Sequence, residues 1–341
     1  MSSIIHKSFD ELFSLSNLFI AWREFRRGKT GKRDVMDFEM HLEDNIFSLF
    51  ERLQAGLYKH SPYTHFQIFD NKKRDIYKAK IEDRIIHQVI YEYLLGIYEP
   101  LFISDSYASR INKGQSKAVK SFRYFVKLAG DRGGNCYVLK CDIKKYFDSV
   151  DQVMLLNILL KELFGDGGKY VHEKVLKTIS EVIFSYNSKY GIGKGIPLGN
   201  VTSQIFANIY LNELDQYVKK ELRCRFYVRY NDDFVIISRN AKWLEEIRQK
   251  VIIFTSQRLN LEIPFEKTSI RKVGWGTDFL GFTVLPNAML LRNKTKNKIY
   301  RNISNKSMDS YMGILKQCNS HNLSKKVVYE YDRKNDAAKY C

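Results

Sequence analysis

One stretch, from Phe226 to Ile237, restricts the fold more than any other part of the chain; it reads FYVRYNDDFVII. Two apolar runs rich in β-branched and aromatic residues flank an Asn-Asp pair, and this pattern predicts a tight β-hairpin. Asp232 and Asp233 would then be adjacent carboxylates at the hairpin tip, where they repel each other unless something neutralises them. Mg²⁺ binds protein carboxylates together with phosphates and waters. A solvated Asp-Asp turn is the alternative.

A third carboxylate, Asp142, ends the apolar run that begins at Tyr137. This pattern predicts a buried strand with Asp142 at its end. Only tertiary folding could bring Asp142 to Asp232. Two cations roughly 4 Å apart, held by such carboxylates, stabilise both the attacking and the leaving oxygen of a phosphoryl transfer. Taken alone, Asp142 could instead be a helix N-cap, because Tyr146 and Phe147 follow it.

The charge of the chain favours a polyanionic partner. Its 341 residues carry a formal net charge of +18, with 44% hydrophobic and 14% aromatic residues. Nucleic acid is the first candidate and an anionic membrane the second, since basic surfaces attract both. Composition alone also allows the alternative that this is simply a soluble basic protein.

Cysteine and histidine usage argues against a disulfide framework or a zinc site. The five cysteines form no C-x-x-C pair and the seven histidines form no cluster. No apolar run approaches the ~20 residues that a membrane span needs, and the N-terminus lacks a signal pattern. We expect a cytoplasmic protein with no membrane partner.

Five segments together resemble the sequence boxes of reverse transcriptases, in the same order and at plausible spacing. They are DIKKYFDSV (142–150), GIPLGNVTSQ (195–204), YNDD (230–233), FEKTSI (265–270) and FLGF (279–282). The resemblance runs from about Asn17 into the 280s. It implies an α+β right-hand polymerase that copies RNA into DNA, with an antiparallel-sheet palm.

The resemblance also implies three domains. These are fingers over residues 1–134, a palm over 135–284 and a short, basic helical thumb over 285–341. Residues 282–341 carry 12 Lys and Arg against 4 Asp and Glu. Such a density of positive charge suits a domain that contacts the duplex and makes binding dependent on salt. A flexible basic tail is the alternative.

By resemblance, Asp142, Asp232 and Asp233 bind two Mg²⁺ ions, and Ile143 is assigned to the same metal site. Lys267 matches a lysine near the leaving pyrophosphate, a proposed general acid; a surface lysine is the alternative. Primer and template contacts are assigned to Tyr230 and to the primer grip, Phe279, Leu280 and Gly281.

The resemblance assigns the nucleotide triphosphate to Arg110, and more loosely to Arg74, Lys78 and Lys113. Arg suits phosphate because its planar fork donates two parallel hydrogen bonds. A structural salt bridge is the alternative for Arg110. Phe147 matches an aromatic residue that excludes a ribose 2′-hydroxyl, and a core phenylalanine is its alternative.

Within the second box, Gly199 would let the backbone approach a nucleotide, because it has no Cβ. Leu198 and Gln204 depart from the commoner Gln and Ser-Pro pattern of the family. An aliphatic residue followed by Ser-Gln resembles the reverse transcriptases of diversity-generating retroelements. Leu198 offers no amide hydrogen bonds, so its control of base-pair geometry should be weaker. A neutral substitution is the alternative.

This subfamily resemblance implies an enzyme encoded by a bacterium or phage that copies an element-encoded template RNA into error-rich cDNA. Its partners would be template RNA, a primer or cDNA strand, dNTPs and a small helical accessory protein, itself an oligomer. A group II intron, retron or phage-defence reverse transcriptase is one alternative. A catalytically silent RNA-binding protein with the same fold is another.

Periodicity also predicts the main elements. Strand-like segments are expected at 66–76 and 137–142, and turns at 130–134 and 165–168. Helices are expected over residues 9–28, 37–53, 81–95, 154–164, 171–184, 201–218, 243–259, 300–315 and 324–331.

Overall fold

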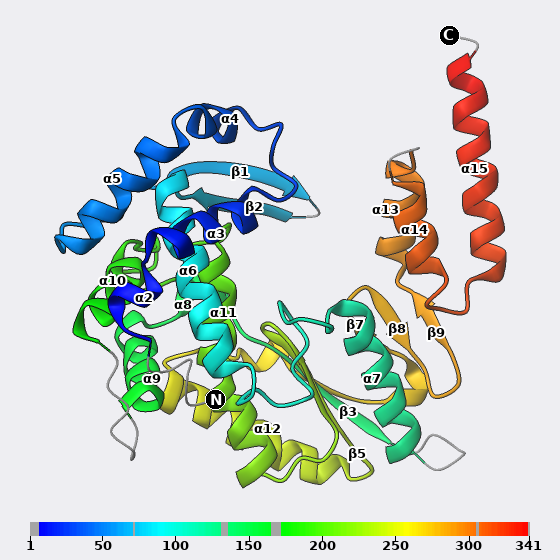
Figure 1. Ribbon diagram of the computed structural model, residues 1–341. Helices are drawn as coiled ribbons and strands as arrows, with labels where there is room; N and C mark the ends of the chain where they lie inside the picture. Colours follow the sequence, from blue (N-terminus) through cyan, green and yellow to red (C-terminus); the bar gives the residue numbers. More distant parts are fainter. Residues whose placement is uncertain (1–6, 71, 131–135, 165–171, 305–306, 340–341) are drawn as a thin grey trace. The chain divides into compact units, whose positions relative to one another are not determined.

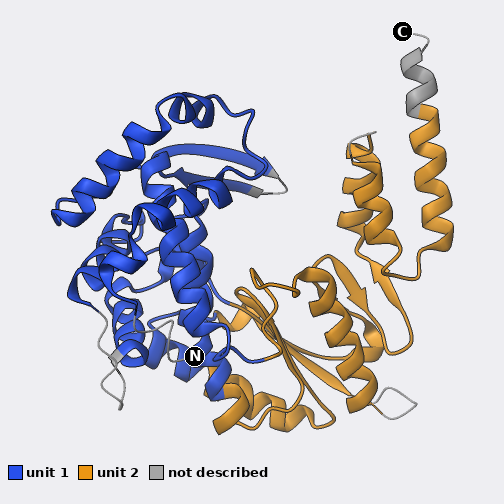
Figure 2. Cartoon of the chain, in the orientation of Figure 1, with its two compact units in different colours: residues 1–103, 143–217, 252–263 blue, residues 104–142, 218–251, 264–341 orange. Residues whose placement is uncertain are grey.

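The computed structural model describes residues 7–70, 72–130, 136–164, 172–304 and 307–339 (Figure 1). Its contacts divide the chain into two compact units (Figure 2). Unit 1 comprises residues 1–103, 143–217 and 252–263, and unit 2 comprises residues 104–142, 218–251 and 264–341. The chain enters each unit more than once. The expected fingers, palm and thumb are three continuous segments, whereas each unit combines several segments. The division into three domains therefore stays a prediction.

Unit 1 is mainly helical. Its central helix, α6 (Ile81–Tyr98), is buried on nearly all sides and packs against α3 and α11, as expected for a helix that is apolar around most of its circumference. The other α-helices described wholly within this unit are α2 (Phe9–Leu12), α3 (Leu15–Arg26), α4 (Arg33–Met40), α5 (Leu42–Gln54), α8 (Tyr146–Ser149), α9 (Gln152–Phe164), α10 (Glu173–Phe184) and α11 (Val201–Gln216), and the end of α12 (Ala241–Leu259) also belongs to it.

A two-stranded antiparallel ribbon also belongs to unit 1. It consists of β1 (Thr64–Asp70) and β2 (Lys72–Lys78), with His65 opposite Tyr77 and Ile68 opposite Arg74. Phe69 is 79% exposed, so the ribbon keeps apolar side chains in solvent.

Unit 2 contains a four-stranded antiparallel sheet with the strand order β4-β5-β3-β6. The strands are β3 (Tyr137–Asp142), β4 (Tyr227–Tyr230), β5 (Asp233–Ser238) and β6 (Ser269–Lys272). The central strands are buried along most of their length. Their β-branched and aromatic residues suit such a surface.

Helix α7 (Gln115–Ala129) packs on one face of this sheet (Figure 1). Its apolar residues Val119, Phe122 and Val126 share one buried core with Val138 of β3 and Val235 of β5. This core continues into a second antiparallel sheet and the C-terminal helices. These elements are β7 (Thr277–Phe279), β8 (Phe282–Val284), β9 (Met289–Leu291), α13 (Asn293–Asn302), α14 (Met308–Leu315) and α15 (His321–Lys339).

Several predicted helix boundaries were wrong. The expected helix over 9–28 is two helices, because the Ser14 side chain accepts a hydrogen bond from the Asn17 N–H and starts a new helix there. The expected helix over 37–53 begins earlier, at Arg33, and breaks at His41. The segment 300–315 contains the end of α13 and all of α14. Residues 131–134 of the first expected turn and all of the second expected turn, 165–168, lie outside the described residues.

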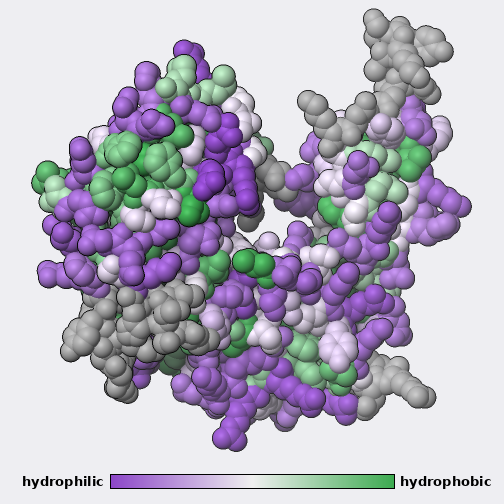
Figure 3. Space-filling model, viewed as in Figure 1, coloured by the Kyte–Doolittle hydropathy of each residue, from purple (hydrophilic) through white to green (hydrophobic). Residues whose placement is uncertain are grey.

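The structure confirms the hairpin at 226–237, the strand ending at Asp142, and α6, α9, α11 and α12 (Ala241–Leu259) to within a few residues. The helix expected over 324–331 is present as α15, but it is much longer, from His321 to Lys339. Among the described helices, none combines the length and the apolar character that crossing a bilayer requires. Hydrophilic side chains cover most of the face seen in Figure 3, with scattered hydrophobic areas among them.

Candidate active site

Strand pairing brings the three candidate carboxylates to one end of the unit 2 sheet. Asp142, the last residue of β3, lies directly opposite Asp233, the first residue of β5. Asp233 also pairs with Tyr230 of β4, so Asn231 and Asp232 form the turn of the hairpin. Asn231 has φ +52°, a conformation that Asn tolerates better than most residues. Directly opposed strand residues have Cβ atoms about 5 Å apart.

Asp233 is held in an environment that disfavours its charge. Burial raises the pKa of its carboxyl group to about 6, with Lys140 opposing the shift and Asp232 adding to it. Lys140 Nζ lies 3.4 Å from Asp233 Oδ2. Among the described residues, the buried Oδ1 has no hydrogen-bond partner. A buried carboxylate oxygen of this kind is costly unless a cation or donor meets it.

Asp142 faces a second lysine. Lys267 Nζ lies 3.3 Å from Asp142 Oδ1, and both side chains are a little under half exposed. Lys267 ends the short 3₁₀ helix Phe265–Lys267. Arg248 holds this segment, since its guanidinium stacks 3.9 Å from the centre of the Phe265 ring and donates to Thr268 Oγ1.

The donor set fits Mg²⁺, because hard carboxylate oxygens are its usual protein ligands and Asp233 Oδ1 is left unsatisfied. As the side chains stand, no three carboxylate, imidazole or thiol groups of the described residues are grouped closely enough to hold a cation. Ammonium groups of Lys140 and Lys267 lie against two of the acids instead. The binding of two ions by Asp142, Asp232, Asp233 and Ile143 therefore stays a prediction.

A buried arginine connects the Asn231–Asp232 turn to the loop that follows Ile103. Arg229 of β4 is fully buried; it donates from one guanidinium nitrogen to the Asn231 carbonyl and from the other to Ser106 Oγ. Two backbone hydrogen bonds strengthen this connection. Arg229 N donates to the Asp105 carbonyl, and Tyr107 N donates to the Arg229 carbonyl. The loop thereby pairs with β4.

The same loop carries Arg110 and Lys113. Arg110 donates to the Ser106 carbonyl at 2.9 Å, and Lys113 Nζ donates to the Ser104 carbonyl at 2.6 Å. Both cations are thus oriented by the loop itself. Their proposed contact with a triphosphate stays a prediction.

The predicted primer grip forms the turn between β7 and β8. Leu280 and Gly281 both have positive φ values, +49° and +85°. Two-residue hairpin turns with φ > 0 at both positions match the twist of the strands. Gln115 Nε2 donates to the Leu280 carbonyl at 2.6 Å. Phe279 is buried in the core of unit 2.

In unit 1, Leu198 and Gly199 form a loop docked on β2. The Tyr77 N–H donates to the Leu198 carbonyl at 2.9 Å, and Asn200 Nδ2 donates to the Tyr77 carbonyl at 2.9 Å. Gly199 has φ +116°, and a Cβ there would lie 2.9 Å from Ile76 Cγ2. Only glycine fits this close approach.

Phe147 belongs to the same part of unit 1. Its carbonyl accepts a hydrogen bond from Ile196 N at 2.8 Å, and its half-buried ring packs edge-on against Tyr146. Lys78 is paired with Asp34 at 2.6 Å. Arg74 and Gln204 are exposed. The nucleotide assignments of these residues remain predictions.

Two residues of the candidate site were not predicted from the sequence. Lys140 is two positions before Asp142 on one strand, so the alternation of a β-strand puts both on one face; that signal was available. Arg229 interrupts an apolar run, and a charged residue in such a run signals a specific buried partner.

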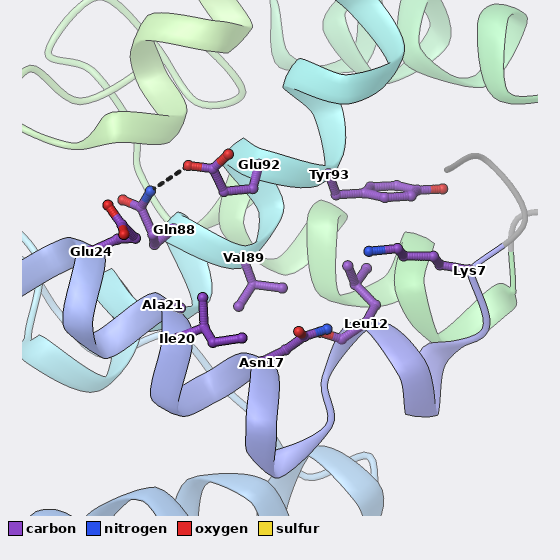
Figure 4. A pocket seen from close by; sticks show the side chains of 10 residues that line it. All are labelled: Lys7, Leu12, Asn17, Ile20, Ala21, Glu24, Gln88, Val89, Glu92 and Tyr93. Carbon is purple, nitrogen blue, oxygen red and sulfur yellow. Dashed lines mark hydrogen bonds between the residues drawn. The ribbon is translucent and has the colours of Figure 1, made fainter. Parts of the chain in front are cut away.

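A separate cavity of about 180 Å³ lies between α2, α3 and α6 in unit 1 (Figure 4). Val89 and Tyr93 line its apolar part, and Gln88 donates to Glu92 at its edge. None of the predicted site residues lines this cavity, so it is no part of the candidate active site.

Comparison with known proteins identifies the family to which most of the chain is similar. A family model described as reverse transcriptase (RNA-dependent DNA polymerase) matches residues 63–284. Group II intron-encoded protein LtrA of Lactococcus lactis subsp. cremoris is 23% identical over 308 residues, covering 71% of this chain and 50% of LtrA. Protein YkfC of Escherichia coli K12 is 25% identical over 271 residues, covering 70% of each chain.

Solved structures share the fold. An apo telomerase from Candida tropicalis has a TM-score of 0.52 at 14% identity, covering 76% of this chain and 52% of the telomerase. A Candida albicans telomerase in complex with a telomeric RNA fragment has a TM-score of 0.50 at 14% identity, covering 78% and 54%. The predicted α+β polymerase fold is thus confirmed. The chain spans about half the length of LtrA.

Proposed function

We propose, since the chain belongs to the reverse transcriptase family, that it catalyses RNA-templated synthesis of DNA from dNTPs. The observation that carries the proposal is the strand register. It places Asp142 directly opposite Asp233, which follows the turn residue Asp232, although Asp142 comes from a distant segment of the chain. Converging carboxylates are what a metal-assisted nucleotidyl transfer requires.

In this proposal, Asp142, Asp232 and Asp233 hold two Mg²⁺ ions. When bound, such ions lower the pKa of a primer hydroxyl and neutralise phosphate charge. Lys140 and Lys267 must give up their present contacts with the acids. Lys267 then becomes free to stabilise the leaving pyrophosphate, because an ammonium beside developing negative charge lowers its energy. Arg110 orients the triphosphate from its loop on β4.

Primer extension tests the function. The purified protein should extend a DNA primer on an RNA template when Mg²⁺ and dNTPs are present. Asp232→Ala should reduce incorporation by about 10²–10³-fold, because mutations that remove one group stabilising the charge of the transition state typically cost this much. A parent protein that stays inactive with its own RNA and accessory partner would favour the silent RNA-binding alternative.

We further propose that the enzyme serves a diversity-generating retroelement, on the strength of Leu198 and Gln204. Its template would be an element-encoded RNA, its product error-rich cDNA, and its partner a small helical accessory protein. A template repeat and a variable repeat beside the gene would support this assignment. Their absence would favour a group II intron, retron or phage-defence type.

Leu198 offers a direct test of fidelity. Leu198→Gln should lower misincorporation several-fold, mainly opposite template adenine, because a glutamine amide adds hydrogen bonds that Leu198 lacks. Reactions with each dNTP omitted in turn measure this error rate. Leu198→Met, which adds no amide, is the matched control and should keep the error rate of the parent. An unchanged rate in Leu198→Gln would contradict the assigned role.

A further inference from the structure

Helix α7 carries a basic stripe on its solvent face. Lys117, Lys120, Tyr124 and Lys127 recur at intervals of three and four residues, and all four are exposed. We call them the α7 stripe. Residues three and four apart lie on one side of a helix, opposite the buried residues Ala118, Phe122 and Val126. Tyr124 is 57% exposed in the middle of the stripe.

The positive charge of the stripe is not balanced within the helix. The segment from Lys113 to Gly130 contains no Asp or Glu. Like charges at this spacing destabilise a helix, and Lys117 in the first turn opposes the helix dipole. Over the described part of the chain, no carboxylate forms an ion pair with Lys117, Lys120 or Lys127. An external polyanion would relieve this repulsion.

The stripe lies above the sheet face that bears the carboxylates. Strand alternation puts Val138 and Asp142 of β3 on one face, together with Val235 and Asp233 of β5. The buried side of α7 packs on Val138 and Val235. Within unit 2, α7 therefore covers the same face as Asp142 and Asp233, farther along the strands. Its stripe lies on the exposed side of the helix, where Lys117 Nζ donates to the Asn112 carbonyl at 2.5 Å.

The chemistry of the stripe favours RNA over other anionic partners. Lysine ammonium groups suit phosphates as compact point charges, and an exposed aromatic ring among them suits an unstacked base. From Lys117 to Lys127 the helix rises about 15 Å at ~1.5 Å per residue. A strand with one phosphate per ~3.4 Å would present about four phosphates over this length.

We propose that the α7 stripe is a contact surface for a single-stranded segment of the RNA, with phosphates on its three lysines and a base stacked on Tyr124. This inference rests on the proposed function for the choice of nucleic acid as substrate class. It adds a named surface outside the motifs of the family resemblance.

Fluorescence anisotropy with a labelled single-stranded RNA tests the surface. The variant Lys117→Gln/Lys120→Gln/Lys127→Gln should bind RNA at least tenfold more weakly than the parent at moderate salt. The dependence of log K on log[salt] should become shallower by about 2, because each phosphate contact on a single strand contributes about 0.7. Tyr124→Leu should weaken binding without changing this slope. The thermal midpoint of the triple variant should stay or rise, since repulsion has been removed.

The control variant Lys177→Gln/Lys242→Gln/Lys250→Gln removes the same charge from exposed lysines elsewhere, and it should bind RNA almost as the parent does. Equal losses in the two variants, or an unchanged slope in the stripe variant, would overturn the proposal. So would equally stripe-dependent binding of polyglutamate. Primer extension reports the proposed function separately: a parent that binds RNA through the stripe but never extends a primer contradicts only that function.

Discussion

Asp233→Asn should abolish polymerase activity and at the same time stabilise the metal-free protein. Activity should fall by about 10²–10³-fold, because the neutral amide neither balances a divalent cation nor replaces the lost carboxylate. Stability should rise because burial raises the pKa of Asp233 to about 6, so its charged form is costly in the folded state.

The direction of the stability change follows from proton linkage. The folded protein binds more protons than the unfolded chain between the unfolded pKa near 3.8 and the folded value of about 6, so stability falls as pH rises through this interval. Each pKa unit corresponds to about 1.36 kcal/mol. Since the pair with Lys140 is also lost, we expect Asn to add about 1–2 kcal/mol at pH 7.5, or roughly 1–3 °C in the thermal midpoint of a chain of this length.

Thermal unfolding at pH 4 and at pH 7.5 measures the effect. The gain in stability should be absent at pH 4 and complete at pH 7.5. Adding Mg²⁺ should raise the midpoint of the parent but not that of the variant. Asp37→Asn, at an exposed position of α4, is the control and should change neither activity nor stability. If Asp233→Asn were less stable than the parent at pH 7.5, the claim that burial disfavours the charged form of Asp233 would be wrong.

Gly199→Ala should damage both stability and nucleotide use. Its φ of +116° disfavours any side chain, and its Cβ would lie 2.9 Å from Ile76 Cγ2. Backbone strain costs about 1–3 kcal/mol and overpacking a further 1–3 kcal/mol. Because the Leu198 carbonyl accepts from Tyr77 N of β2, shifting the loop moves the segment that carries the nucleotide-binding candidates. We expect the KM for dNTP to rise by about tenfold.

Gly193→Ala is the matched control for this prediction. Gly193 also has a positive φ, +71°, but nothing lies within 4 Å of the Cβ that alanine would add. It should lose only the strain contribution, about 1–2 kcal/mol, and keep the KM of the parent. Urea unfolding and steady-state dNTP titration separate the two effects. Equal behaviour of the two variants would show that the contact with Ile76 has no role.

Local patterns were sufficient for the elements around the acids. Two apolar runs rich in β-branched and aromatic residues around an Asn-Asp pair predicted β4 and β5, and the apolar run to Asp142 predicted β3. They could not predict the register, because Asp142 opposite Asp233 depends on which strands pair. The break in the first helix was also missed, since Ser14 as an N-cap competes with an apolar pattern that continues through it.

The contacts that orient the site could not be predicted from local patterns either, because they also depend on which distant segments meet. Gly199 against Ile76 and Arg229 on Ser106 join segments distant in the sequence, and neither segment alone indicates its partner. Lys140 is different, because its place two residues before Asp142 made its face predictable. The ion pairs of Lys140 and Lys267 with the acids depend on side-chain rotamers, which no sequence pattern specifies.

Iron-directed cleavage tests the shared metal site most directly. Fe²⁺ with ascorbate and peroxide, added with primer, RNA template and dNTP, produces hydroxyl radicals where the ion is bound. Mass spectrometry should find cuts near both Asp142 and Asp232, suppressed together by excess Mg²⁺ and absent in Asp233→Asn. Cuts near only one of these segments, or cuts that Mg²⁺ leaves unchanged, would contradict a cation site shared by the three acids.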